Sequence, residues 1–181
     1  MDDFSSYSNE IIDQLAGAQA CIWVLGGPAF RYPDYTTAKT VNVDYVESAA
    51  MTFATALASR LPKSQKFHFV YVSGQSVARD QTKKLWMFED SRKIKGLVEN
   101  RLVEIQENHP ETFASYLLRP GSVLLQGMAW KIAGALTRPI QDSVGVEAMA
   151  AVLIDVAMEG WESQVMENDV LKARGQALLL K

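Results

Sequence analysis

Apolar side chains follow two alternating patterns along the chain. Residues 66–73 form a nearly continuous apolar run rich in β-branched and aromatic residues, which is typical of a strand buried on both faces. Longer segments, such as residues 91–108, carry apolar residues three and four positions apart, which is typical of helices packed on one side. The alternation predicts an α/β fold, a three-layer sandwich in which helices cover both faces of a parallel sheet.

The two patterns place the elements in order. Strands are expected at residues 21–25, 66–73 and 114–118. Helices are expected at residues 8–16, 40–60, 91–108, 128–136, 146–157 and 168–176. Three strands is a small number for a domain of this length, so we expect a sheet that is short on its N-terminal side.

Composition narrows the function classes. The chain has 181 residues, of which 48% are hydrophobic, and a net charge of -3, so we expect a single domain over residues 1–181 with no attraction to nucleic acid or membrane. The acidic start does not resemble a signal peptide, which favours a cytoplasmic protein. Cys21, the single cysteine, excludes an internal disulfide and is expected to be a buried, inert thiol.

Candidate chemistry lies where the strands end, because ligands of open parallel sheets bind at the carboxyl ends of the strands. Ser73 follows the second strand and either binds a substrate oxygen or caps the turn at Gly74. Arg119 follows the third strand and either binds an anionic or carbonyl group or makes a local turn contact. Lys95, on the helix that follows Ser73, points either into the cleft or into solvent.

The polar loop at residues 75–90 supplies further candidates. Arg79 and Asp80 either bind a polar substrate and transfer protons above the sheet or form a solvated surface pair. Trp86 and Tyr32 are expected mainly to pack, with a role as walls of an apolar pocket as the alternative. His68 is mid-strand and is expected to be a core or sheet-face residue, and no group of residues has the spacing of a metal site.

Four motifs occur in the order in which they occur in a known family. They are Asn42-Val43-Asp44, Val72-Ser73-Gly74, a lysine near the start of the next helix (Lys95) and Arg119-Pro120-Gly121. Together they resemble the atypical or extended short-chain dehydrogenase/reductase superfamily, which includes NAD-dependent epimerase/dehydratase-like and NmrA-like proteins. The resemblance runs from about residue 11 to residue 176. Proteins of this type occur in fungal secondary metabolism.

The chain departs from the family pattern in two places. It contains no G-x-G-x-x-G turn, and its first strand matches the family's fourth, so the resemblance implies a partial Rossmann-like fold that lacks the first βαβαβ nucleotide-binding unit. The family's Tyr-x-x-x-Lys pair is also altered: Lys95 is present, but Ser91 stands at the tyrosine position. A serine hydroxyl is a far weaker acid than a phenol, whose pKa is ~10, so Ser91 is kept only as a substrate-binding candidate.

These departures predict a cofactor-free protein with an uncovered sheet edge. Without a phosphate-binding turn, no NAD(P) or other cofactor is expected. The strand at residues 21–25 would lose its neighbour in the family's strand order, and an apolar edge of this kind needs a cover. We therefore expect a homodimer joined near this edge or across the helix-facing surfaces left exposed.

Three functions remain open. The preferred one is a cofactor-independent enzyme, of the isomerase, cyclase or dehydratase type, acting on a small apolar, polyketide-like or terpenoid-like substrate. Ser73, Lys95 and Asp80 would then be catalytic, and Arg119, Arg79, Trp86, Ser91 and Tyr32 would bind substrate. The alternatives are a non-catalytic NmrA-like binding or regulatory module, and an NAD(P)-dependent reductase whose N-terminal part is missing.

Overall fold

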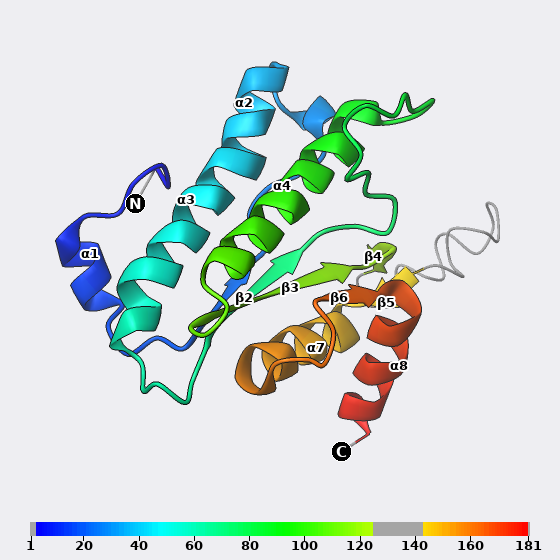
Figure 1. Ribbon diagram of the computed structural model, residues 1–181. Helices are drawn as coiled ribbons and strands as arrows, with labels where there is room; N and C mark the ends of the chain where they lie inside the picture. The colour runs from blue at the N-terminus through cyan, green and yellow to red at the C-terminus, as the bar shows by residue number, and fades with distance from the viewer. Residues whose placement is uncertain (1–2, 125–142, 181) are drawn as a thin grey trace.

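A parallel sheet forms the centre of the molecule (Figure 1). The computed structural model describes residues 3–124 and 143–180. Its main sheet has the order β1-β2-β3-β6, and all neighbouring strands are parallel. The strands are β1 (Ala20–Trp23), β2 (Phe67–Val72), β3 (Phe113–Arg119) and β6 (Val165–Glu167). The predicted α/β fold with a parallel sheet is therefore confirmed.

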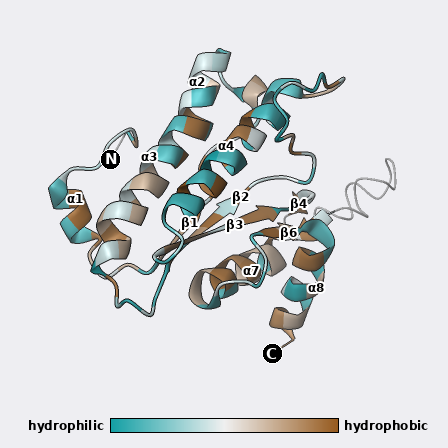
Figure 2. Cartoon of the chain, viewed as in Figure 1, coloured by the Kyte–Doolittle hydropathy of each residue, from teal (hydrophilic) through white to brown (hydrophobic). Residues whose placement is uncertain are grey.

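Helices cover both faces of this sheet. The helices α3 (Tyr45–Thr52) and α4 (Glu89–Asn108) lie on one face, and α7 (Val146–Glu159) and α8 (Asn168–Leu179) lie on the other (Figure 1). The strands are largely hydrophobic, whereas the helices also carry hydrophilic residues (Figure 2). Two clusters of buried side chains fill the spaces above and below the sheet. A short helix, α1 (Asn9–Gln14), precedes β1.

The helical segment before β2 is longer and less regular than the sequence predicts. It begins with α2 (Tyr35–Lys39), because the Asp34 side chain caps it by accepting from the Thr37 N–H at 2.7 Å. A π-helical turn (Thr40–Asp44) leads into α3, and a second one (Phe53–Leu57) and a 3₁₀ turn (Ala58–Arg60) follow. Another 3₁₀ turn (Ala29–Arg31) lies between β1 and α2.

The pattern missed three short strands. The expected count of three strands is corrected by β6, which pairs with the end of β3 and makes the main sheet four-stranded. The other two, β4 (Ser122–Leu124) and β5 (Ser143–Gly145), form a separate parallel pair. Each of the three has only three residues, too few for a periodic signal. The helix expected at residues 128–136 lies outside the described residues.

Strand β1 is an edge of the main sheet. Apolar residues at and just after its end are solvent-exposed: Ile22 by 38%, Val24 by 64% and Leu25 by 42%. His68, on the neighbouring strand β2, bonds through its Nδ1 to the Ala157 carbonyl at 3.0 Å and packs edge-on against Tyr116. His68 is thus a sheet-face residue, as expected. Among the described helices, none is long and apolar enough to cross a membrane.

Candidate functional site

A cavity of about 430 Å³ opens at the carboxyl ends of β1 and β2. We call it the main cavity. Its wall is mostly apolar, with a small number of polar side chains, which is the usual character of a small-molecule site. The lining residues are Val24, Leu25, Gly26, Gly27, Pro28, Asn42, Tyr71, Val72, Gly74, Ser76, Val77, Ser91, Arg92 and Lys95. A cavity thus lies at the edge of the sheet where the sequence predicts a site.

Asn42 holds the turn that forms one wall of the main cavity. Its side chain is buried in the π-helical turn, where Oδ1 accepts from the Gly27 N–H at 2.9 Å and Nδ2 donates to the Ala38 carbonyl at 2.8 Å. Gly26 has a φ of +122°, and a Cβ there would lie 2.5 Å from Asn42 Oδ1. A glycine is therefore required at this position, both for its backbone angle and for its closeness to Asn42.

The opposite wall is a loop packed tightly against α4. The Ala78 N–H donates to the Arg92 carbonyl at 3.0 Å, and Arg92 Nε donates to the Ser76 carbonyl at 2.6 Å. At Gly96, a Cβ would lie only 1.8 Å from the Ala78 carbonyl oxygen. The absence of a side chain at Gly96 thus allows the loop to approach the helix and close this side of the cavity.

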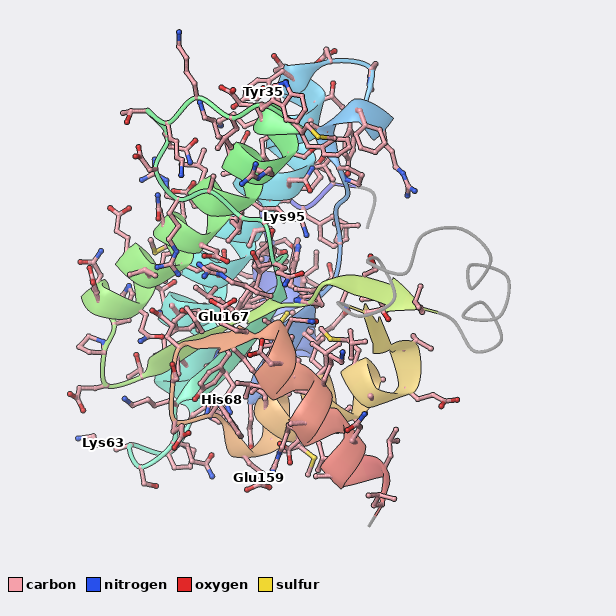
Figure 3. The ribbon with its side chains drawn as sticks, turned by 90° about the vertical axis from the view of Figure 1, so that its right-hand side faces the viewer. Tyr35, Lys63, His68, Lys95, Glu159 and Glu167 are labelled. Atoms are coloured by element: carbon pink, nitrogen blue, oxygen red, sulfur yellow. The ribbon has the colours of Figure 1, made fainter. Side chains whose placement is uncertain are left out.

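Lys95, which Figure 3 labels on α4, is a half-buried cation in this wall. Its ammonium donates to the backbone carbonyl of Ser73, beside Gly74. No carboxylate lines the main cavity among the described residues. Burial lowers the pKa of Lys95 from its ordinary value, and the nearby charge of Glu99 opposes that shift. The ammonium is therefore placed to donate a hydrogen bond or a proton to a ligand oxygen.

Ser73 and Glu99 form the centre of a buried ionic cluster behind the main cavity. Glu99 lies one turn after Lys95 on α4 and is fully buried. Its Oε1 accepts from Ser73 Oγ at 2.6 Å and from Arg119 Nε at 2.9 Å. Its Oε2 accepts from Arg79 Nε at 2.6 Å and from Arg119 Nη2 at 2.5 Å. We call these four residues the Glu99 cluster.

The register of the sheet explains why this cluster forms. Val72 pairs with Leu118, so Ser73 and Arg119 leave adjacent strands side by side. Arg119 pairs in turn with Glu167 on β6, and its Nη1 donates to Glu167 Oε1 at 2.8 Å. Glu99 thus joins α4 to the ends of β2 and β3, and Arg119 links this cluster to β6 through Glu167.

The ionisation of the cluster follows from these contacts. Burial alone would raise the pKa of Glu99, but hydrogen bonds from Arg119, Ser73 and Arg79 outweigh it and hold the pKa below its ordinary value. The same pairing raises the pKa of Arg119. Glu99 is therefore ionised at neutral pH, and its charge is balanced by two guanidinium groups.

The residues singled out from the sequence separate into two groups. Lys95 and Ser91 line the main cavity, and Ser91 Oγ accepts from the Ala29 N–H at 2.8 Å. The Ser73 side chain and the two arginines, Arg79 and Arg119, face Glu99 instead and are absent from the cavity wall.

The remaining candidates lie away from the cavity. Asp80 is exposed on the loop, where its carboxylate accepts from the Thr82 hydroxyl and N–H, and these bonds lower its pKa. Trp86 projects into solvent, and 96% of the residue is exposed. Tyr32 lines a second, smaller hollow next to the main cavity. Neither Asp80 nor Trp86 lines the main cavity.

Sequence reasoning missed Glu99 and Arg92. A signal for Glu99 was present: it lies within the apolar stripe of α4, between Val98 and Leu102, where an acid needs a buried partner. Nothing in the pattern distinguished Arg92 from its neighbour Lys93. No group of three or more His, Cys, Asp or Glu residues in the described part of the chain is arranged to hold a metal ion.

The chain is similar to a distant relative from a biosynthesis cluster. No protein-family model matches the chain. The chain is 29% identical over 109 residues to the leucinostatins biosynthesis cluster protein T of Purpureocillium lilacinum. The match covers 59% of this chain and 35% of that protein, so it spans about a third of the relative's length.

Proposed function

We propose that this protein binds a small, largely apolar molecule in the main cavity and promotes a proton-transfer step on it without a redox cofactor. The step would be an isomerisation, cyclisation, dehydration or rearrangement. The observation that carries the proposal is Lys95: a half-buried ammonium, with a lowered pKa, in an apolar cavity without a lining carboxylate among the described residues. Such a group suits a ligand carbonyl, enolate or phenolate oxygen.

The other cavity side chains have supporting roles in this proposal. The hydroxyl of Ser91 accepts from a backbone N–H and keeps its own proton available for a ligand oxygen. Arg92 adds a second positive charge to the same wall. Ser73 acts indirectly, since its carbonyl accepts from Lys95 and its hydroxyl donates to Glu99. Asp80 and Trp86, outside the cavity wall, carry no part of the step.

Two further observations support the scaffold and the setting that we propose. The parallel sheet, with Ser73 and Lys95 together at the end of β2, is consistent with a short-chain-dehydrogenase-like scaffold without its dinucleotide-binding unit. The relative's name places that protein in a biosynthesis cluster, which favours a secondary-metabolite substrate for this chain as well. We propose a polyketide-like or terpenoid-like one because the main cavity is mostly apolar.

Proton exchange in deuterated water tests the proposal directly. The purified protein is incubated with a panel of polyketide-like and terpenoid-like ketones, and deuterium incorporation and product formation are followed by mass spectrometry. We expect turnover without NAD(P)H, and a loss of about 10²- to 10⁴-fold in the Lys95→Met variant, the usual contribution of a positioned acid or base. Lys93→Met, on the same helix but paired with Glu89, is the matched control and should retain activity.

The other outcomes point to other functions. Turnover that requires NAD(P)H would overturn the proposal in favour of a reductase. Tight binding of a panel member without any exchange or product would instead favour a non-catalytic, regulatory module.

We also propose that two copies of the chain associate through the β1 edge. The support is the open edge strand itself, with Ile22, Val24 and Leu25 exposed beside its unpaired backbone. Light scattering after size exclusion should give twice the mass of the chain. Val24→Lys places a charge on the edge and should give a monomer, whereas Glu111→Lys, at the start of the turn before β3, should leave the dimer intact. A wild-type monomer at high concentration would refute the association.

A further inference from the structure

A second hollow, of about 240 Å³, lies beside the main cavity, and four aromatic rings line it. The rings belong to Phe30, Tyr32, Tyr35 and Phe88, and we call the space the aromatic hollow. The ring centroids of Phe30 and Phe88 are 6.0 Å apart. Both residues are more exposed than buried, at 68% and 61%, so the hollow presents aromatic surface to solvent. Exposed apolar surface of this kind commonly marks a binding site.

The charge of the aromatic hollow is opposite to that of the main cavity. Its wall contains the carboxylates of Asp34, Glu89 and Asp90 and no lysine or arginine among the described residues. The main cavity has Lys95 and Arg92 and no such carboxylate. The two spaces are neighbours, since Ser91 lines both. A ligand group that fits one of them is therefore disfavoured electrostatically in the other.

The carboxylates of the hollow differ in how far they are already paired. The Asp34 carboxylate caps α2, and Glu89 binds Lys93 at 2.6 Å and the Leu85 N–H at 2.9 Å. The Asp90 side chain is exposed and forms no hydrogen bond or ion pair with another described residue. Acidic residues at helix starts are common because they offset the helix dipole, so they would not indicate a ligand by themselves. The four aromatic rings that line the same hollow are a second, independent feature, and together with the carboxylates they indicate a ligand.

We infer that the aromatic hollow binds the organic ammonium group of a ligand. The face of an aromatic ring is negative and attracts a cation, and the attraction is strongest when several rings and a carboxylate surround the cation. A methylated ammonium also buries its methyl groups against the rings. This site contains neither Lys95 nor Arg92, which act in the proposed reaction. The ammonium site can therefore be disproved without disproving the proposed reaction, and the reverse also holds.

Choline and its uncharged isostere, 3,3-dimethylbutan-1-ol, test this inference as a matched pair of probes. Each is titrated into the ¹⁵N-labelled full chain and followed by amide chemical shifts. We expect choline to move the amides of Ala29, Tyr35 and Glu89 and to leave that of Gly26 in place. The isostere has the same shape without the charge and should bind at least about fivefold more weakly. Equal binding of the two probes, or no binding of choline, would overturn the inference.

Variants locate the bound probe. Tyr35→Leu removes a ring that is 49% exposed, and Asp90→Asn removes the unpaired charge, so neither disturbs the core. Each should weaken choline binding by about fivefold while the rest of the spectrum is retained. Lys95→Met should leave choline binding unchanged. If Lys95→Met alters choline binding and Tyr35→Leu does not, the probe lies in the main cavity and the inference is wrong.

Discussion

Two charged residues one turn apart on α4 have opposite surroundings. Glu99 is fully buried, and its carboxylate oxygens accept four hydrogen bonds from Ser73, Arg79 and Arg119. Lys95 is half-buried, is bonded to a backbone carbonyl and faces an open cavity. The same helix therefore carries one charge whose partners all come from the protein and one whose remaining partner can come from a ligand.

The difference shows which charges in this molecule are structural and which are available for binding. A buried charge with every acceptor position occupied joins chain segments, and here it joins the ends of β2 and β3 and the loop that follows β2. Lys95 has lost solvent without full compensation, because the nearby Glu99 carboxylate is already paired with Arg79 and Arg119. A ligand oxygen that supplies the compensation is then bound more strongly than it would be at the surface.

The largest expected effect comes from removing the Glu99 charge. Glu99→Gln leaves Arg79 and Arg119 without their shared carboxylate, so we expect the free energy of unfolding to fall by about 3 kcal/mol. Urea denaturation followed by circular dichroism measures the change. The control is Glu104→Gln on the same helix, whose side chain is 59% exposed and pairs only with surface groups. That variant should differ from wild type by less than about 1 kcal/mol. If both variants lowered the free energy of unfolding equally, the buried Glu99 charge would be no more important for stability than an exposed one.

Acid should weaken the same cluster in a defined range. The pKa of Glu99 is held below its ordinary value of 4.5 in the folded protein. Its stabilising contribution is therefore complete above pH 4.5 and is lost as the pH falls through the folded pKa. The gap in stability between wild type and Glu99→Gln should be constant from pH 7 to about 5 and shrink below 4.5. Thermal melts at pH 3 to 7 measure this gap in stability. A gap that widens in acid would contradict a lowered pKa for Glu99.

Much of this arrangement could be predicted from the sequence. The apolar run of β2 indicated a strand buried on both faces, and the spacing in α4 indicated which side of that helix packs. Since parallel strands present ligand sites at their carboxyl ends, these two elements were enough to predict a site at this edge, with Lys95 pointing either into it or into solvent.

The partners of the charges could not be predicted in the same way. Ser73 and Arg119 lie at strand ends, so each was predicted to contact either a ligand or the local turn, but the register of β2 and β3 brings both onto Glu99 instead. Register depends on how whole strands pair, and a shift of one residue would turn every side chain of the strand to the opposite face of the sheet. Arg119 also binds Glu167 on β6, a strand too short to be recognised. Long-range pairing of this kind has no local signal in the chain.

The smallest expected effect is on stability when the Lys95 charge is removed. Lys95→Met keeps the aliphatic stem, loses the bond to the Ser73 carbonyl and removes a partly desolvated charge that has no carboxylate beside it in the cavity. The lost hydrogen bond and the relieved desolvation oppose each other, so the free energy of unfolding should change by less than about 1 kcal/mol. Urea denaturation measures it alongside Glu99→Gln. If Lys95→Met destabilised the protein by as much as Glu99→Gln, Lys95 would belong to the structural charges. If Lys95→Met is stable but no longer acts on its ligand, the charge of Lys95 serves ligand binding and not stability.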